Sequence, residues 1–187
     1  MLTKLFRANA LTASQAAQIA SDASDRLGLA IGLIEAEWCF YIEHKEPFDG
    51  RELVTLDWLL SETFEPYGFS DTSRISATTV LEVGPRLNFE TPFSSTAVAI
   101  CHKCGLYKVT RLERSIRYGL DVSLDEKQGD KFLAPLYDRM VEMRYCEPLT
   151  SLGLVRKPES VQTIVVMADN WRENLQAYAH RSAAYGE

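Results

Sequence analysis

Residues 81–118 read LEVGPRLNFETPFSSTAVAICHKCGLYKVTRLERSIRY, and this stretch decides the fold that the sequence predicts. Its apolar start is typical of a strand, which ends at Gly84 and Pro85. The polar turn that follows leads into a Ser-Ser-Thr run, in which Ser94 or Ser95 is predicted to cap a helix. Gly105 would end that helix, because glycine readily adopts the left-handed conformation of a helix C-terminus. With the alternating segment that comes next, the stretch predicts a β-α-β unit.

The segment from Val109 to Val122 alternates between apolar and polar residues, which is the period of a strand with two unlike faces. One face is apolar and contains Leu112, Ile116, Tyr118, Leu120 and Val122. The other is polar and contains Arg111, Glu113, Ser115, Arg117 and Asp121. Arg114 alone interrupts the apolar face. Because long strands usually bend and glycine often marks the bend, we predict a β-bulge at Gly119.

The first part of the chain shows the same order of elements. Residues 2–8 predict a strand, and Thr12 with Gln15 forms a capping box at the start of a helix that ends at Gly28. Residues 34–44 then alternate, with apolar residues on one side and mainly polar residues on the other. This alternation predicts a strand with one buried face.

Further helices and a tail complete the expected chain. Asp49 and Glu52 begin a helix with an apolar stripe through Leu60, and Pro66, Tyr67 and Gly68 are expected to end it before a polar loop and a strand over 78–83. Another helix is predicted through Leu133, Leu136, Tyr137, Met140 and Val141. Its regular part is expected to start near Pro135, because proline would break a helix interior. In the tail we expect a linker, a strand at 161–167, and a helix that begins at Asp169 or Asn170 and contains Trp171, Leu175, Tyr178 and Ala179.

This order predicts an α+β fold in which two β-α-β halves form an antiparallel sheet covered by helices. We expect one domain at residues 1–148, followed by a linker and the start of a linker-domain-like tail at 149–187.

The composition is ordinary for a globular protein, with 46% apolar and 25% charged residues. The net charge of −6 argues against broad nucleic-acid binding, which requires a basic surface. The sequence has neither a secretory leader nor an apolar run long enough to span a membrane. We therefore expect a soluble, cytoplasmic protein whose four cysteines are thiols.

No motif points to chemistry in the chain itself. Cys101 and Cys104 form a C-x-x-C pair, but no second pair completes a zinc site, and the pair is expected at a helix end, where the dipole does not lower a thiol pKa. The two serines at 94–95 lack a G-x-S-x-G elbow, and no phosphate-binding glycine motif is present. The polar turn at 86–91 and the charged strand face are interpreted as a docking surface or, alternatively, as a solvated face with weak ion pairs.

The stretch at 81–118 resembles the N-terminal domain of the large phosphoribosylformylglycinamidine synthases, also called formylglycinamide ribonucleotide amidotransferases. The family pattern is roughly E-V-G-P-R-x-N-x-x-T-P-x-S-[ST], then a helix ending C-x-x-x-G-L, then V-x-R-x-E-x-x-R-Y. The matching residues are Glu82, Val83, Gly84, Pro85, Arg86, Asn88, Thr91, Pro92, Ser94, Ser95, Cys101, Gly105, Leu106, Val109, Arg111, Glu113, Arg117 and Tyr118.

Flanking segments extend the resemblance over most of the chain. Residues 35–41 are similar to the family's E-x-E-x-C-[FY]-x strand, and residues 52–60 contain its L-x-W-L pattern. Residues 137–142 read YDRMVE where the family has H-D-R-M-T-E, so Tyr137 replaces a histidine. The tail departs further, because residues 169–175 read DNWRENL where the family has a glycine-rich G-x-G-R-x-A-L pattern.

The resemblance implies a place in purine biosynthesis. The family's enzyme converts formylglycinamide ribonucleotide to its amidine with ATP and with ammonia from glutamine. Its N-terminal domain is similar to a dimer of the small PurS subunit, in agreement with two β-α-β halves. The family's synthase motif, N-S-E-H-C-R-H, is absent here. The resemblance thus implies an assembly domain or subunit that docks the synthase and glutaminase parts, with no catalytic, cofactor-binding or metal-binding residues, and ATP and Mg²⁺ only in the complete enzyme.

We assign the docking surface to polar residues of the central stretch, namely Arg86, Asn88, Thr91, Ser94, Ser95, Arg111 and Glu113. An alternative is that these residues only shape the strand-turn-helix. A competing function is a stand-alone PurS-like scaffold or regulatory module that forms a homodimer through its sheet edges. A third alternative, a small redox or zinc protein, would rest on the C-x-x-C pair.

Overall fold

The structure is a computed structural model that describes residues 1–61, 66–153, 172 and 176. The chain divides into two compact units, Met1–Val155 and Arg156–Glu187. The fold below is that of the first unit. In the second, Arg172 and Gln176 are helical and exposed, and the expected strand at 161–167 and most of the expected last helix lie outside the described residues. None of the helices in the described ranges has the length and apolar character needed to cross a membrane.

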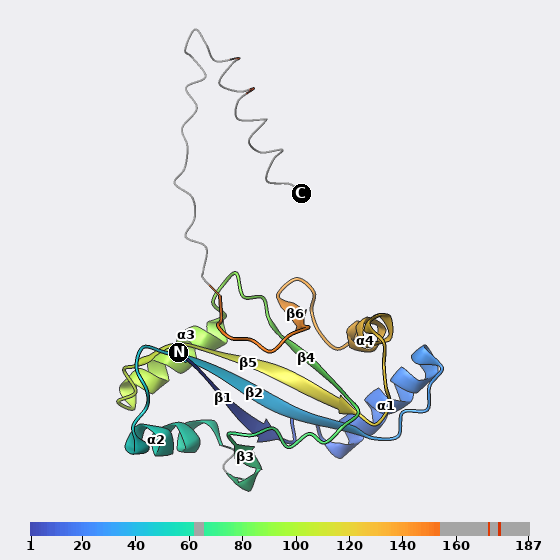
Figure 1. Cartoon of the computed structure of the whole chain (residues 1–187), viewed down its shortest axis with the longest axis horizontal. Coiled ribbons are helices and arrows are strands. Elements are labelled where there is room, and N and C mark those ends of the chain that lie inside the picture. The colour runs from blue at the N-terminus through green and yellow to red at the C-terminus, as the bar shows by residue number, and fades with distance from the viewer. Residues whose placement is uncertain (62–65, 154–171, 173–175, 177–187) are drawn as a thin grey trace. The chain divides into compact units, whose positions relative to one another are not determined.

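A six-stranded antiparallel sheet forms the centre of the first unit, with strand order β3-β1-β2-β5-β4-β6. The strands are β1 Leu2–Ala8, β2 Ile34–His44, β3 Phe69–Ser70, β4 Thr79–Pro85, β5 Val109–Leu120 and β6 Glu142–Tyr145. The long strands β2 and β5 pair in the middle, so the two predicted β-α-β halves meet there (Figure 1). The α+β prediction is confirmed.

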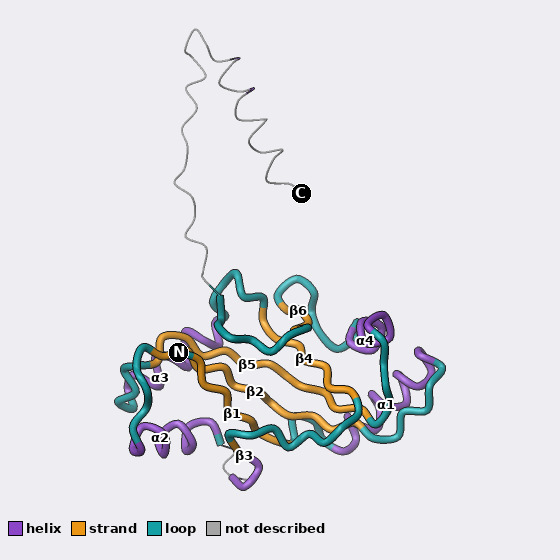
Figure 2. The backbone as a smooth tube through the Cα atoms, in the orientation of Figure 1, coloured by secondary structure: helices purple, strands orange, loops and turns teal. Residues whose placement is uncertain are grey.

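The α-helices are α1 Ala13–Leu27, α2 Gly50–Leu60, α3 Pro92–Lys103 and α4 Glu126–Leu133, with a short 3-10 helix η1 at Pro66–Gly68. They lie at the two ends of the sheet, α2 and α3 at one end and α1 and α4 at the other (Figure 2). Each pair covers an apolar cluster on the same face of the sheet. The cluster under α1 and α4 includes Tyr118 and Phe132, and the one under α2 and α3 includes Phe40 and Leu112.

Both predicted ends of α1 and the predicted start of α2 are confirmed, while α2 ends at Leu60, before the expected stop at Pro66–Gly68. Thr12 with Gln15, and Asp49 with Glu52, form complete capping boxes. Each box satisfies backbone N–H groups that have no partner inside the helix. Gly28 ends α1 with φ 65, a left-handed conformation that favours glycine.

The prediction of a single buried face on β2 is wrong. Ile42 is buried on the helix side, but Glu37, Cys39 and Tyr41 on the opposite side are also at most 2% exposed. The chain after β6 explains this burial, because Leu152 is part of the same cluster as Cys39 and Tyr41. The sheet is therefore covered by helices on one face and, in part, by connecting segments on the other.

The helix predicted through residues 133–141 is also wrong. The helix α4 ends at Leu133, and residues 142–145 form β6. Asp125 and Gln128 form a capping box that starts α4 earlier than the apolar pattern suggested. Pro135 then follows the helix rather than beginning it, since proline cannot continue a helical hydrogen-bond ladder.

No bulge lies at Gly119, which corrects a second backbone prediction. The pairing of β2 with β5 is regular through Gly119, and its one register shift falls at Glu43 and His44. A Cβ atom on Gly119 would lie 2.3 Å from Cγ2 of Ile75 and 2.9 Å from Cβ of Ala77. Glycine is needed here because the segment before β4 crosses closely over β5.

Candidate interaction surface

The turn between β4 and α3 is held in place by Arg111 on β5. The guanidinium of Arg111 donates hydrogen bonds to the backbone carbonyl of Phe89 in the turn and, at 3.0 Å, to that of Leu152. Its Nε atom donates to Glu113 Oε1 at 3.0 Å. Arg111 and Glu113 are 5% and 1% exposed, so a buried ion pair joins the turn to the segment that follows β6.

Glu113 connects this ion pair to the start of α3. The Thr91 hydroxyl donates to Glu113 Oε2 at 2.6 Å, and the Thr91 backbone N–H donates to Oε1 at 3.2 Å. The Thr91 oxygen also caps α3 by accepting from the Ser94 N–H, so the prediction that Ser94 or Ser95 caps this helix is wrong. Ser94 is fully buried, and its hydroxyl oxygen accepts from the backbone N–H of Leu112 at 3.2 Å. Strand, turn and helix are thus locked together by one hydrogen-bonded network.

The seven residues predicted to form a docking surface therefore separate into two groups. Arg86, Asn88 and Ser95 are exposed and remain candidates for contact with a partner. Thr91 is half-buried, and the other three are buried within the network, namely Ser94, Arg111 and Glu113. For these buried residues the structure supports the alternative that they shape the strand-turn-helix.

Arg86 lies beside an exposed apolar segment that sequence reasoning missed. Its Nη2 and Nε atoms donate to the backbone carbonyl of Arg139 at 2.6 and 3.1 Å. Its backbone N–H donates to the Val141 carbonyl at 3.0 Å. Pairing of β4 with β6 brings Met143 opposite Gly84.

Three apolar side chains of this segment are exposed. Met140, Val141 and Met143 are 82%, 48% and 37% exposed. We call Arg86, Asn88, Met140, Val141 and Met143 the turn–strand edge. The signal was present in the sequence but was assigned to the interior of a helix, because the apolar spacing of residues 133–141 fits a helix period.

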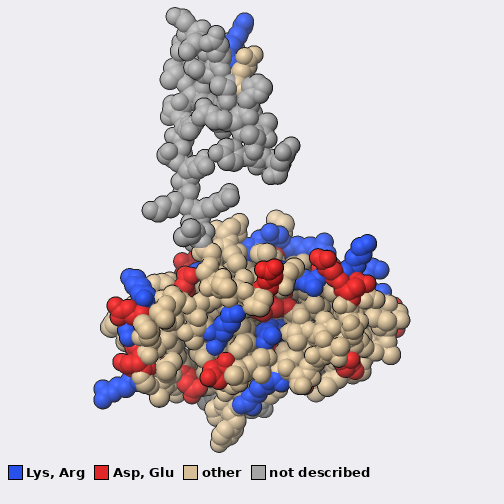
Figure 3. All heavy atoms as spheres, in the orientation of Figure 1, with Lys and Arg blue, Asp and Glu red and all other residues tan. Residues whose placement is uncertain are grey.

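The middle of the helix-free sheet face carries a polar cluster. Arg117 lies 2.6 Å from Glu37 and 3.5 Å from Glu82, and the hydroxyls of Tyr41 and Ser115 both donate to Glu82. Burial raises the pKa of the Tyr41 hydroxyl, and the nearby carboxylate of Glu82 adds to this. On the face shown in Figure 3, acidic and basic side chains are interspersed. Because these charged groups pair with one another, the cluster is explained by its role in holding the sheet together and is not counted as a candidate binding site.

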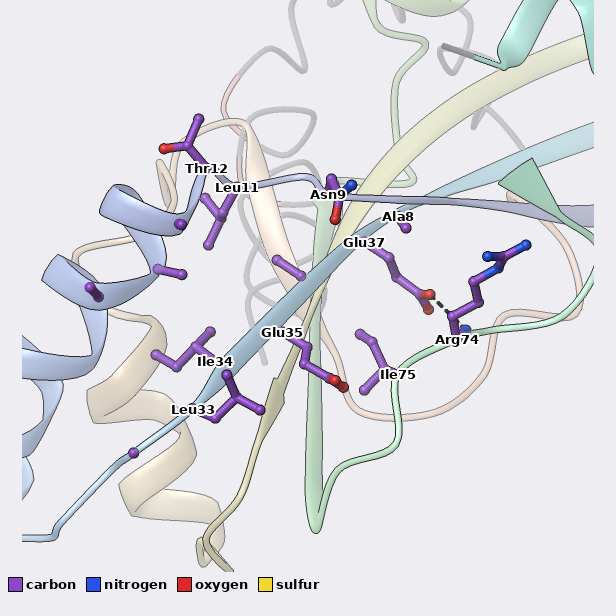
Figure 4. Close-up of a pocket in the computed structure, with 15 residues that line it drawn as sticks. Ala8, Asn9, Leu11, Thr12, Leu33, Ile34, Glu35, Glu37, Arg74 and Ile75 are labelled. Atoms are coloured by element: carbon purple, nitrogen blue, oxygen red, sulfur yellow. Dashed lines mark hydrogen bonds between the residues drawn. The ribbon is translucent and has the colours of Figure 1, made fainter. Parts of the chain in front are cut away.

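A cavity of about 450 Å³ lies between the start of α1, the start of β2 and the segment at 74–75. Figure 4 shows Glu35 and Glu37 extending from β2 toward Arg74 and Ile75. The backbone N–H of Arg74 donates to Glu37 at 3.1 Å, and that of Ser76 donates to Glu35 at 3.0 Å. None of the predicted site residues lines this cavity.

The C-x-x-C pair falls at the end of α3, as predicted. Cys101 is buried and Cys104 is the exposed C-cap residue. Burial raises the pKa of Cys101 to about 11, with a smaller contribution from Cys104. Among the residues that the structure describes, no group of three or more His, Cys, Asp or Glu side chains is arranged to hold a metal ion.

We predict that two of the four thiols react rapidly in the folded protein. Cys104 and Cys146 are exposed, whereas Cys39 and Cys101 are buried. Burial, with a contribution from Glu82, raises the pKa of Cys39 to about 12, so only about one molecule in ten thousand carries its thiolate at pH 8. Iodoacetamide labelling followed by peptide mass spectrometry should modify Cys104 and Cys146 first. Labelling in guanidinium chloride is the control and should modify all four, and equal rates in the folded protein would contradict the structure.

Comparison with known sequences gives one family. Residues 37–151 match the family described as formylglycinamide ribonucleotide amidotransferase N-terminal. The chain is 37% identical over 180 residues to a phosphoribosylformylglycinamidine synthase of Dictyostelium discoideum, covering 90% of this chain and 13% of that protein. It is 34% identical over 171 residues to a probable phosphoribosylformylglycinamidine synthase, chloroplastic/mitochondrial, of Arabidopsis thaliana, covering 87% and 12%.

A human phosphoribosylformylglycinamidine synthase is 40% identical over 82 residues, which is 43% of this chain and 6% of the human protein. The chain thus spans only about an eighth of the length of the first two relatives, whose matched shares are 13% and 12%.

Proposed function

The chain belongs to the formylglycinamide ribonucleotide amidotransferase N-terminal family, and we propose that it is the assembly domain or subunit of a phosphoribosylformylglycinamidine synthase. In this proposal the complete enzyme uses ATP and glutamine to convert formylglycinamide ribonucleotide to its amidine. In this proposal, this chain holds the synthase and glutaminase parts in a fixed relative position and supplies no catalytic residue. The relative position of the two parts is important, because free ammonia would take up a proton and escape before it reached the synthase site.

The turn–strand edge carries the proposal. Met140 and Val141 expose apolar surface, and Arg86 lies beside them through its hydrogen bonds to the carbonyls of Arg139 and Val141. Exposed apolar groups next to arginine are typical of protein interfaces. The buried ion pair of Arg111 with Glu113 fixes the turn that carries Arg86 and Asn88. A surface that is rigid before association loses less conformational entropy on binding.

The proposal assigns ATP and Mg²⁺ to other parts of the complete enzyme, because this chain contains no phosphate-binding glycine motif. The cytoplasm is our proposal for the compartment. The name of the Arabidopsis relative places that protein in plastids or mitochondria, so the compartment is specific to each protein. The alternative of an independent scaffold has no separate observation in its favour.

We predict that charge placed on the turn–strand edge uncouples the two activities of the complete enzyme. The substitution Met140→Asp, alone or with Arg86→Ala, should lower glutamine-dependent turnover about tenfold, since a central interface residue contributes more than about 1 kcal/mol. Turnover supported by added ammonium salt should change little, because it does not need ammonia from the glutaminase. The measurement is the ratio of the two rates.

The matched control is Leu33→Asp in the α1–β2 connection, where Leu33 is 59% exposed. This variant adds the same charge to another exposed apolar position and should leave the ratio unchanged. Full glutamine-dependent activity in both Met140→Asp and Arg86→Ala would exclude the turn–strand edge as the docking surface.

A further inference from the structure

Arg114 is the single charged residue on the otherwise apolar face of β5, and the structure shows where its side chain lies. The guanidinium carbon is 4.2 Å from the centre of the Trp38 ring and 4.9 Å from that of Phe93. Trp38 belongs to β2 and Phe93 to the first turn of α3. Two aromatic rings from different elements therefore hold one cation, and stacking of this kind leaves the guanidinium N–H groups free to donate at its edge.

No acid balances this cation within the described ranges. Neither a hydrogen bond nor an ion pair joins Arg114 to a carboxylate there. Burial lowers the pKa of Arg114, and the positive charge of Arg7 lowers it further. Arg114 nevertheless remains exposed, so its N–H groups are accessible from solvent. A partly desolvated guanidinium without an anionic partner provides a favourable position for an incoming carboxylate, with which it can form two parallel hydrogen bonds.

The position opens into a groove between α2 and α3. The groove has a volume of about 200 Å³, and Arg7, Phe93, Ile100 and Arg114 are among the residues that line it. Phe93 and Ile100 are 36% and 46% exposed. A carboxylate on Arg114 would therefore lie next to open apolar surface.

The size of the groove favours a protein segment over a free metabolite. Sites for small molecules usually enclose about 300–1,000 Å³, whereas 200 Å³ accommodates one or two side chains. Further apolar surface is exposed on α2, where Val54 and Trp58 are 69% and 71% exposed. These residues are four apart and so lie on one side of the helix. This side is opposite to the one that carries the buried Leu56 and Leu60, so Val54 and Trp58 do not line the groove.

We propose that this groove binds a segment of a protein partner in which an Asp or Glu is adjacent to an aromatic or large aliphatic side chain. The partner's carboxylate pairs with Arg114, and its apolar side chain contacts Phe93 and Ile100. This surface is separate from the turn–strand edge and does not depend on the role proposed for that edge.

A peptide titration tests this recognition directly. The full chain, labelled with ¹⁵N, is titrated to millimolar concentration with acetyl-Ala-Glu-Phe-Leu-Ala-amide and, in parallel, with the same peptide carrying Gln in place of Glu. We expect the acidic peptide to shift the amide signals of Phe93, Ala97 and Ile100. We expect the Gln peptide to bind about tenfold more weakly, because a hydrogen bond to a charged group is worth at least that factor.

Variants of Arg114 distinguish its charge from the apolar surface. Arg114→Gln should remove the difference between the two peptides, and Arg114→Lys should restore part of it. The matched control is Arg26→Gln on α1, which should behave as the unaltered chain, with circular dichroism to verify folding. Absence of shifts, equal affinity for the two peptides, or unchanged selectivity in Arg114→Gln would overturn the proposal. An Arg114-dependent homodimer in sedimentation, without peptide shifts, would also overturn it in favour of self-association.

Discussion

The substitution Arg111→Ala is expected to lower the free energy of unfolding by about 3–5 kcal/mol, because it removes one partner of a buried ion pair. Glu113 would then hold a negative charge at 1% exposure without its cation. The carbonyls of Phe89 and Leu152 would also lose their donor, and each unsatisfied buried group adds to the cost. Urea unfolding followed by circular dichroism measures the change.

Two further variants separate charge from geometry. Arg111→Lys keeps the charge, but lysine lacks the planar guanidinium that lets Arg111 donate to three acceptors. This variant should therefore recover only part of the lost free energy of unfolding. The double variant Arg111→Met with Glu113→Leu should be less destabilised than Arg111→Ala, since no buried charge is left unpaired. Arg51→Ala, at an exposed position of α2, is the control and should change stability by less than about 0.5 kcal/mol. A loss of that small size in Arg111→Ala would contradict the network.

The substitution Phe132→Ala should be comparably severe, at about 3–5 kcal/mol. Phe132 is fully buried and meets the ring of Tyr118 edge-on, with ring centres 5.9 Å apart at 74°. Its removal would leave a cavity between α4 and the sheet that the surrounding residues fill only in part. The shift in the urea midpoint at constant slope measures this loss.

The control for this variant is the adjacent exposed residue, Lys131. Lys131→Ala keeps the helix and should alter stability by less than about 0.5 kcal/mol. Equal effects of Lys131→Ala and Phe132→Ala would mean that α4 does not present Phe132 to the core.

The same helix shows where prediction from the sequence failed. The apolar residues at 133–141 fit a helix period, but a short helix is determined more by its caps than by a few apolar positions. Asp125 and Gln128 supply the cap of α4. By contrast, the bounds of β1 and β2 and both ends of α1 were predictable, since in each case the pattern and the flanking residues agree.

Burial of the polar sheet face could not be predicted from local pattern. Alternation shows that the two faces of a strand differ, but not that the chain returns to cover the polar one. Leu152, far along the sequence, lies against that face beside Cys39 and Tyr41. The charged residues on the polar face of β5, such as Arg111 and Glu113, consequently form an internal network. One of the two expectations from the sequence is a solvated face with weak ion pairs.

For the candidate site, the sequence located the correct turn but not the surface that accompanies it. Arg86 and Asn88 are exposed as a docking role requires. Met140 and Val141 come next to Arg86 only through the pairing of β4 with β6, a contact between residues more than fifty positions apart. The local sequence does not predict this pairing, because the apolar spacing of residues 133–141 is typical of a helix.

The most direct test of the assembly role is a binding experiment with the chain in its natural sequence. The purified chain is mixed with the synthase and glutaminase parts of the enzyme from the same organism, and the mixture is separated by size exclusion and assayed for glutamine-dependent amidation. The account predicts that the chain co-elutes with these parts and raises glutamine-dependent turnover, and that Met140→Asp abolishes both effects. Separate elution with no change in turnover would contradict the assembly role.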